Sequence, residues 1–190
     1  MKKATNSDTP LKTAAFREAG HAVAHNRLRG PRRYPDVLSI ISYANGTGSG
    51  TREEDWSTDA EYMQDKVVIL CAGYAACIAA GIEEALATQS CYFDLAKAKE
   101  IIVGWHLAPF EEHLEDANDL MWQPENRRAV ARLADELTRH LLLLPQEIDV
   151  LIDVANDAIS EAELARLRAC GLEQDRQHRL SYLSHTHRQH

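Results

Sequence analysis

The chain has 190 residues, of which 45% are apolar and 26% are charged, and its formal net charge is −8 at pH 7. This length and composition are typical of one globular domain and exclude a chain that is disordered throughout. The acidic balance disfavours a nucleic-acid-binding protein, because such a protein needs a positively charged face to neutralise phosphates.

Periodic apolar residues predict a chain made mainly of helices. The predicted helices cover residues 11–29, 60–80, 91–107, 125–143, 146–157 and 160–170. The β-branched run within Asp36–Tyr43 predicts one short strand, and the glycine-rich residues 45–50 predict a turn or a hairpin corner after it. Residues 109–124 are acidic and are expected to form a loop. The predicted N-caps are Thr58 or Asp59 for the second helix and Ser160 for the last.

These elements predict a single, mainly α-helical domain over residues 11–171, with a small strand or hairpin element after the first helix and further helices at its C-terminal end. Residues 172–190 are polar, contain four histidines and are expected to form a disordered tail. The longest uncharged run, Val67–Ile82, has 16 residues and is too short to span a membrane. The four cysteines form no Cys-x-x-Cys pair, and no apolar segment follows the basic N-terminus, so we expect a reduced, cytoplasmic chain.

Ionisable side chains gather on one face of the predicted first helix. Arg17 and Glu18 are followed by His21 at helical spacing, and His25 lies one turn further along. The rest of this helix is rich in alanine, which favours close packing, so we expect the cluster to be partly buried. Buried charges need partners or a metal ion.

The string E-A-G-H-A over residues 18–22 resembles the H-E-A-G-H-A motif of the FtsH family of ATP-dependent zinc metalloproteases. In an H-E-x-x-H helix the two histidines bind zinc, and the glutamate acts as general base on zinc-bound water. The resemblance therefore implies that His21 is a zinc ligand and that Glu18 is the general base. Arg17 occupies the place of the first histidine.

The resemblance extends over about residues 12–107. The stretch A-G-Y-A-A-C at 72–77 is similar to a G-G-R-A-A-E-like stretch of the family, with Cys77 in place of the glutamate. The stretch S-C-Y-F-D-L at 90–95 is similar to G-A-x-x-D-L, and this implies that Asp94 is the third zinc ligand. The chain contains no G-x-x-x-x-G-K-[ST] loop, so it resembles small relatives without the ATPase module, and no ATP binding is expected.

The presence of Arg17 where the family motif has its first histidine puts the implied zinc site in question. A catalytic zinc ion needs three protein ligands, and guanidinium cannot be one because it stays protonated and has no acceptor. In one interpretation Arg17 replaces the metal by pairing with Asp94, Glu18 or both, which gives a non-catalytic pseudo-peptidase.

In the alternative interpretation the domain is an active zinc metallopeptidase with a rewired ligand set. His25 or Cys77 then joins His21 and Asp94 around the metal. Both interpretations imply a polypeptide substrate or a protein partner, and the family relation makes an oligomer possible. Arg17 is the residue that separates them.

Overall fold

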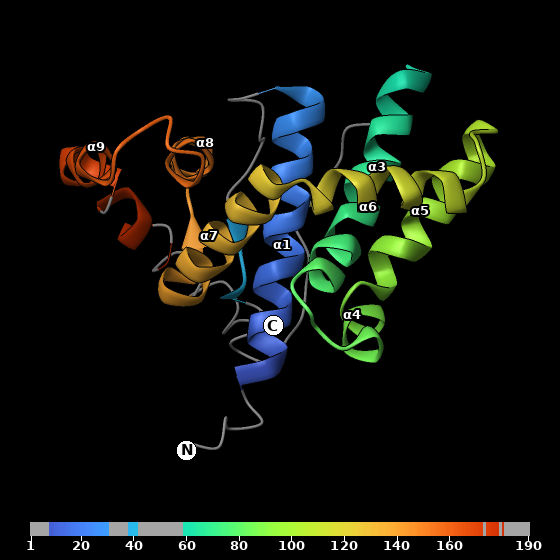
Figure 1. Cartoon of the computed structure of the whole chain (residues 1–190), viewed down its shortest axis with the longest axis horizontal. Coiled ribbons are helices and arrows are strands. Elements are labelled where there is room, and N and C mark those ends of the chain that lie inside the picture. The colour runs from blue at the N-terminus through green and yellow to red at the C-terminus, as the bar shows by residue number, and fades with distance from the viewer. Residues whose placement is uncertain (1–7, 31–37, 42–58, 173, 179, 181–190) are drawn as a thin grey trace.

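A computed structural model describes residues 8–30, 38–41, 59–172, 174–178 and 180, and these residues are mainly helical (Figure 1). The helices are α1 (Asp8–Arg29), α3 (Ala60–Ala79), α4 (Glu84–Ser90), α5 (Tyr92–Trp105), α6 (Phe110–Trp122), α7 (Pro124–His140), α8 (Pro145–Ala155) and α9 (Glu161–Leu167). The segment Arg168–Leu172 that follows α9 is kinked, with non-helical backbone at Cys170 and Gly171. The predicted mainly α-helical fold is confirmed.

A short strand follows the first helix, as predicted, but its partner comes from far along the chain. Strand β1 (Leu38–Ser39) pairs antiparallel with β2 (Leu142–Leu143), so that Leu38 lies opposite Leu143. The backbone N–H of Ile40 extends the contact by donating to the carbonyl of Leu141 at 2.9 Å. The turn predicted at 45–50 lies outside the described residues.

Helix α1 runs through the middle of the fold, with α3 on one side and α7 crossing it on another (Figure 1). Its alanines are fully buried, and they contribute to one core with residues of α3, α6, α7 and α8. Small residues let α1 and α3 approach closely, because a Cβ atom at Gly20 would lie only 2.6 Å from the carbonyl oxygen of Ala72. The close crossing fixes the face of α1 that carries the ionisable cluster.

One predicted element is wrong, and one short helix was not predicted. Residues 109–124 contain helix α6 rather than a loop, because His113, Ala117 and Met121 recur every four residues and are buried, while the acidic side chains occupy the exposed face. The helix predicted over 91–107 is confirmed as α5, and the short helix α4, which Cys91 separates from it, was not predicted.

The predicted helix starts at Asp59 and Ser160 are confirmed. The Asp59 carboxylate accepts a hydrogen bond from the backbone N–H of Glu61 at 3.0 Å, and the Ser160 hydroxyl accepts one from Glu163 at 3.3 Å. Each cap satisfies a donor that the first turn of a helix leaves without a partner.

The C-terminal segment differs from the expected tail in one stretch. Residues 174–178 are helical, and the side chain of Arg176 is fully buried and paired with Glu147. Residues 181–190 lie outside the described part of the chain. The apolar run Val67–Ile82 lies largely within α3 and packs in the core, and no described helix has the length and apolar character that crossing a bilayer requires.

Candidate functional site

The structure brings Arg17, Glu18 and His21 of α1 together with Asp94 of α5. Arg17 and Glu18 are 6% and 1% exposed, so both charges are shielded from bulk water. Asp94 reaches the cluster from the first turn of α5. Four ionisable side chains from two distant segments therefore form one buried cluster.

Gly73 of α3 is the close neighbour that makes room for this cluster. A Cβ atom there would lie 2.5 Å from Cε1 of His21 and 2.9 Å from Cγ of Arg17. Real Cβ atoms do not approach other atoms this closely, so any side chain at this position would displace both residues. The stretch around Gly73 was predicted to be helical, and its role as the wall of the site comes from the structure.

The Arg17 guanidinium makes two hydrogen bonds and one further ion-pair contact. Nη2 donates to Oε1 of Glu18 at 2.7 Å, and Nη1 donates to the backbone carbonyl of Ser90 at 3.0 Å. Nε lies 3.2 Å from Oδ2 of Asp94. The planar fork thus joins α1 to the α4–α5 junction and faces two carboxylates at once.

His21 is held by acceptors at both ring nitrogens. Nδ1 lies 2.8 Å from the backbone carbonyl of Ile69, and Nε2 lies 3.1 Å from Oδ2 of Asp94. A carbonyl and a carboxylate can only accept, so both nitrogens carry hydrogens and the ring is an imidazolium. Burial opposes this charge, but the adjacent Asp94 carboxylate outweighs it and raises the pKa of His21 to about 9.

The pKa values of the Glu18 and Asp94 carboxylates are shifted in opposite directions. Burial raises the pKa of Glu18 above its ordinary value, although Arg17 opposes the shift. Burial also acts to raise the pKa of Asp94, but His21 and Arg17 together outweigh it and the pKa is lowered. Asp94 is therefore the ionised partner that both cations share.

The arrangement of these side chains does not fit a catalytic zinc ion. A catalytic zinc ion needs a third protein ligand beside His21 and Asp94, and the position that should supply it holds Arg17, whose guanidinium has no acceptor. The Asp94 oxygen nearest His21 is also the one that faces Arg17, whose fixed positive charge repels a metal cation. The disagreement with a zinc site lies in the donor set itself.

The two substitute ligands proposed from the sequence do not complete that set. Within the described part of the chain, no three His, Cys, Asp and Glu side chains converge to hold a metal ion. The Cys77 thiol is directed to the backbone carbonyl of Thr13 at 3.6 Å and packs in a small cluster with Cys91. His25 is half-buried one turn beyond His21 on α1.

A second buried ionic cluster was not found from the sequence. Arg168 donates to Glu136 at 2.6 Å and to Glu147 at 2.9 Å, and it thereby links α7 to α8. Glu136 and Glu147 are 1% and 0% exposed. Arg176 also pairs with Glu147, and His140 lies 3.3 Å from Glu136. His140 and Glu136 are four residues apart on α7, but the arginines lie 21 to 32 residues from the glutamates that they contact, so no local spacing pattern reveals those pairs.

The main-chain partners of the first cluster were also missed, because no sequence pattern specifies which carbonyl turns toward Arg17 or His21. The small-residue pattern in α3 was the available signal for Gly73. No protein-family model, curated protein or solved structure matches this chain, so the geometry of the cluster carries the argument on function.

Proposed function

We propose that this domain is a non-catalytic pseudo-peptidase, in which the Arg17 guanidinium takes the place of a metal ion and the fold serves to bind a polypeptide. The observation that carries the proposal is the pairing of Arg17 with both Glu18 and Asp94. In the resemblance to the zinc peptidases these are the general base and a metal ligand. Here one fixed cation satisfies both.

The hydrogen bond and the burial of Glu18 support the proposal that the domain does not hydrolyse peptide bonds. A general base must hold a free carboxylate within reach of a water molecule. Oε1 of Glu18 is bonded to Arg17 at 2.7 Å, and the residue is only 1% exposed. Water therefore has little access to Glu18, and one of its two carboxylate oxygens is already bonded to Arg17.

Elemental zinc analysis of the full chain tests the proposal. Wild type and His21→Ala are expected to hold the same amount of zinc after dialysis against zinc, because histidines elsewhere in the chain contribute equally to both. Restoring the missing ligand with Arg17→His is expected to add about one zinc ion per chain, since it completes a set of two histidines and Asp94.

The matched control is Arg17→His combined with His21→Ala, which keeps the new histidine but removes its partner and is expected to return to the wild-type zinc content. Circular dichroism is used to check that each variant remains helical. If wild type holds about one zinc ion more than His21→Ala, the domain has a metal site of its own and the pseudo-peptidase proposal is wrong.

A further inference from the structure

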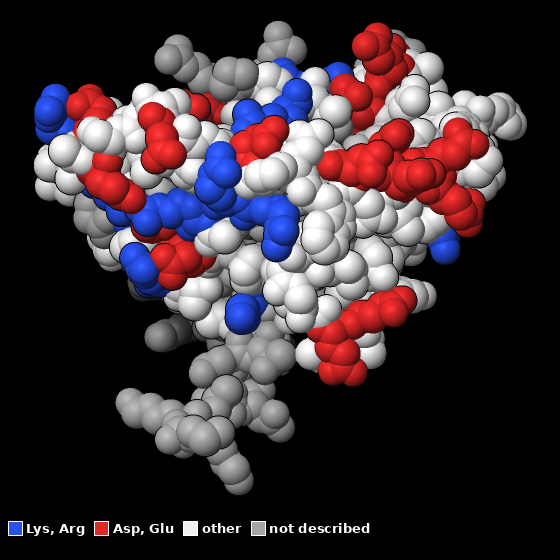
Figure 2. All heavy atoms as spheres, in the orientation of Figure 1, with Lys and Arg blue, Asp and Glu red and all other residues white. Residues whose placement is uncertain are grey.

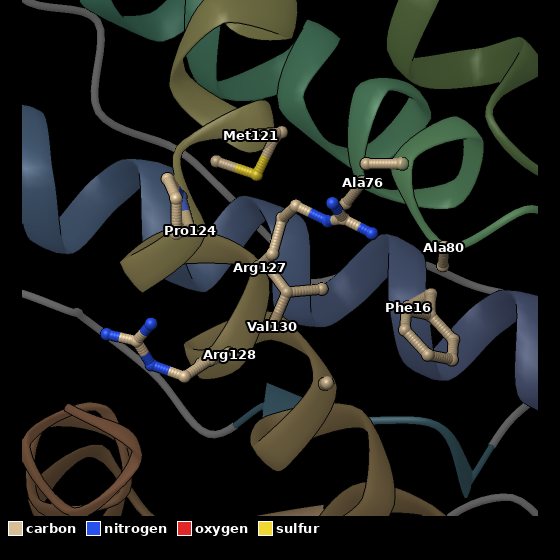
Figure 3. A pocket seen from close by; sticks show the side chains of 10 residues that line it. Phe16, Ala76, Ala80, Met121, Pro124, Arg127, Arg128 and Val130 are labelled. Atoms are coloured by element: carbon tan, nitrogen blue, oxygen red, sulfur yellow. The ribbon is translucent and has the colours of Figure 1, made fainter. Parts of the chain in front are cut away.

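A pocket of about 530 Å³ lies between α1, the end of α3 and the junction of α6 with α7 (Figure 3). Its walls are apolar and include Phe16, Ala76, Met121 and Val130. The size is that of a small-molecule site, and the lining has the predominantly apolar character of such sites. Phe16 precedes Arg17 on α1, but the pocket contains none of the four residues of the ionic cluster.

The polar side chains that line this pocket are both cationic. Arg128 is tethered away from it, since it donates to the carbonyl of Ala155 and to Asn156, each at 3.2 Å. Arg127 points the other way and extends its guanidinium toward Ala76 and Ala80 (Figure 3). The described residues offer Arg127 no carboxylate partner, and its guanidinium lies 5.1 Å from the ring centre of Trp122.

The charge around the pocket is opposite to that of the whole chain. Figure 2 shows blue side chains over α7, while red side chains gather over α6 and α4. No acidic side chain lines the pocket. The N-terminus of α7, where Pro124 lines the pocket, adds the positive end of a helix dipole. An anionic group is therefore favoured at this end, in a molecule with a net charge of −8.

We propose that this pocket binds a straight-chain fatty carboxylate, with its hydrocarbon chain against Phe16, Met121 and Val130 and its head group on Arg127. A peptide would bring amide groups that need donors and acceptors, and the lining side chains other than the two arginines are apolar. A hydrocarbon chain has no such groups. The Arg127 guanidinium, which has no carboxylate partner among the described residues and extends toward the apolar wall, then binds the one charge of the ligand.

Isothermal titration calorimetry of the full chain with decanoate, below its micelle concentration, tests this assignment. One saturable site per chain is expected. Octanoate, with two methylenes fewer, is expected to bind on the order of tenfold more weakly, because each buried methylene contributes to affinity. Decanol, which has the same chain without the charge, is also expected to bind on the order of tenfold more weakly.

Two arginine variants provide the matched comparison. Arg127→Gln is expected to weaken decanoate binding about tenfold or more, whereas Arg128→Gln removes the same charge from the next position and is expected to change it about threefold or less. Ala131→Phe, at an exposed lining position, is expected to reduce binding by filling the pocket.

Three results would overturn the assignment. They are the lack of saturable decanoate binding, equal losses in Arg127→Gln and Arg128→Gln, and tighter binding of an acetylated apolar peptide than of decanoate. The last result would identify the pocket as a peptide site. All three are independent of the zinc content of the chain.

Discussion

Replacing Arg17 with methionine is expected to lower the free energy of unfolding by about 3–5 kcal/mol at pH 8, measured by urea denaturation. The variant keeps most of the side-chain volume but leaves the Glu18 and Asp94 carboxylates buried without their shared cation. Breaking a buried ion pair from one side has this cost because the remaining charge is desolvated and uncompensated.

The loss of stability in Arg17→Met should be smaller at acidic pH. The pKa of Glu18 is raised by burial and held down by Arg17, so it rises further in the variant. A raised pKa in the folded state means that stability is present at low pH and is lost as pH rises through that pKa. The difference between wild type and Arg17→Met is therefore expected to be smaller at pH 5 than at pH 8.

The matched control for this variant is Arg29→Met on the same helix. Arg29 pairs with Asp65 at 2.9 Å, but both side chains are about a quarter exposed, and a loss of about 0–1 kcal/mol is expected. Adding Glu18→Gln to Arg17→Met should recover part of the lost stability by removing a buried charge. Equal losses in Arg17→Met and Arg29→Met would show that the cluster is not the buried assembly described above.

Replacing Arg168 with methionine is expected to cost about 3 kcal/mol at pH 7, because this residue bridges two almost fully buried glutamates. Arg168→Met leaves Glu136 and Glu147 with their remaining partners but removes the link between them. Chemical denaturation monitored by far-UV circular dichroism measures the loss.

Acidic pH should reduce the difference in unfolding free energy between wild type and Arg168→Met. Burial acts to raise the pKa of Glu136, but its hydrogen bond and charge interaction with Arg168 outweigh burial and lower the pKa below the ordinary value of 4.5. A lowered pKa means that stability is present above the unfolded pKa and is lost as pH falls through the folded one. The difference between wild type and Arg168→Met is therefore expected to be largest near neutral pH and to shrink as Glu136 protonates in both chains.

Arg166→Met is the control, since Arg166 lies two residues earlier, has a 75% exposed side chain and pairs only with the surface residue Glu163 among the described residues. It is expected to change stability by less than about 0.5 kcal/mol. A cost in Arg168→Met no larger than this would contradict a bridging role.

Helix geometry was sufficient to predict the three residues of the candidate site that lie on α1. Arg17, Glu18 and His21 share a face because residues three and four apart in a helix are neighbours. Asp94 came only from the resemblance to a zinc-peptidase motif, since no local pattern joins residues 73 apart.

The parts of the fold that were missed depend on tertiary contacts. The acidic residues of α6 predict a loop by composition, although the spacing of His113, Ala117 and Met121 indicates a helix. The pairing of β1 with β2 rests on two residues from each strand, too few to show a pattern. The carbonyls of Ile69 and Ser90 belong to the backbone, where side-chain identity carries no information on orientation.

The position of α1 also matters while the chain is being made. This helix is synthesised before α5, and Asp94 emerges 73 residues after His21, which is roughly 4–15 s of translation. During that interval the alanine-rich helix has none of its later cover from α5, α6 and α7. The charges of Arg17 and Glu18 favour hydration of this segment in the unfolded chain, and the same charges pair with one another inside the folded domain. Replacing all the charged residues of the cluster with apolar ones is expected to stabilise the folded state. It would also leave an apolar helix exposed on the nascent chain, where it could aggregate with neighbouring chains.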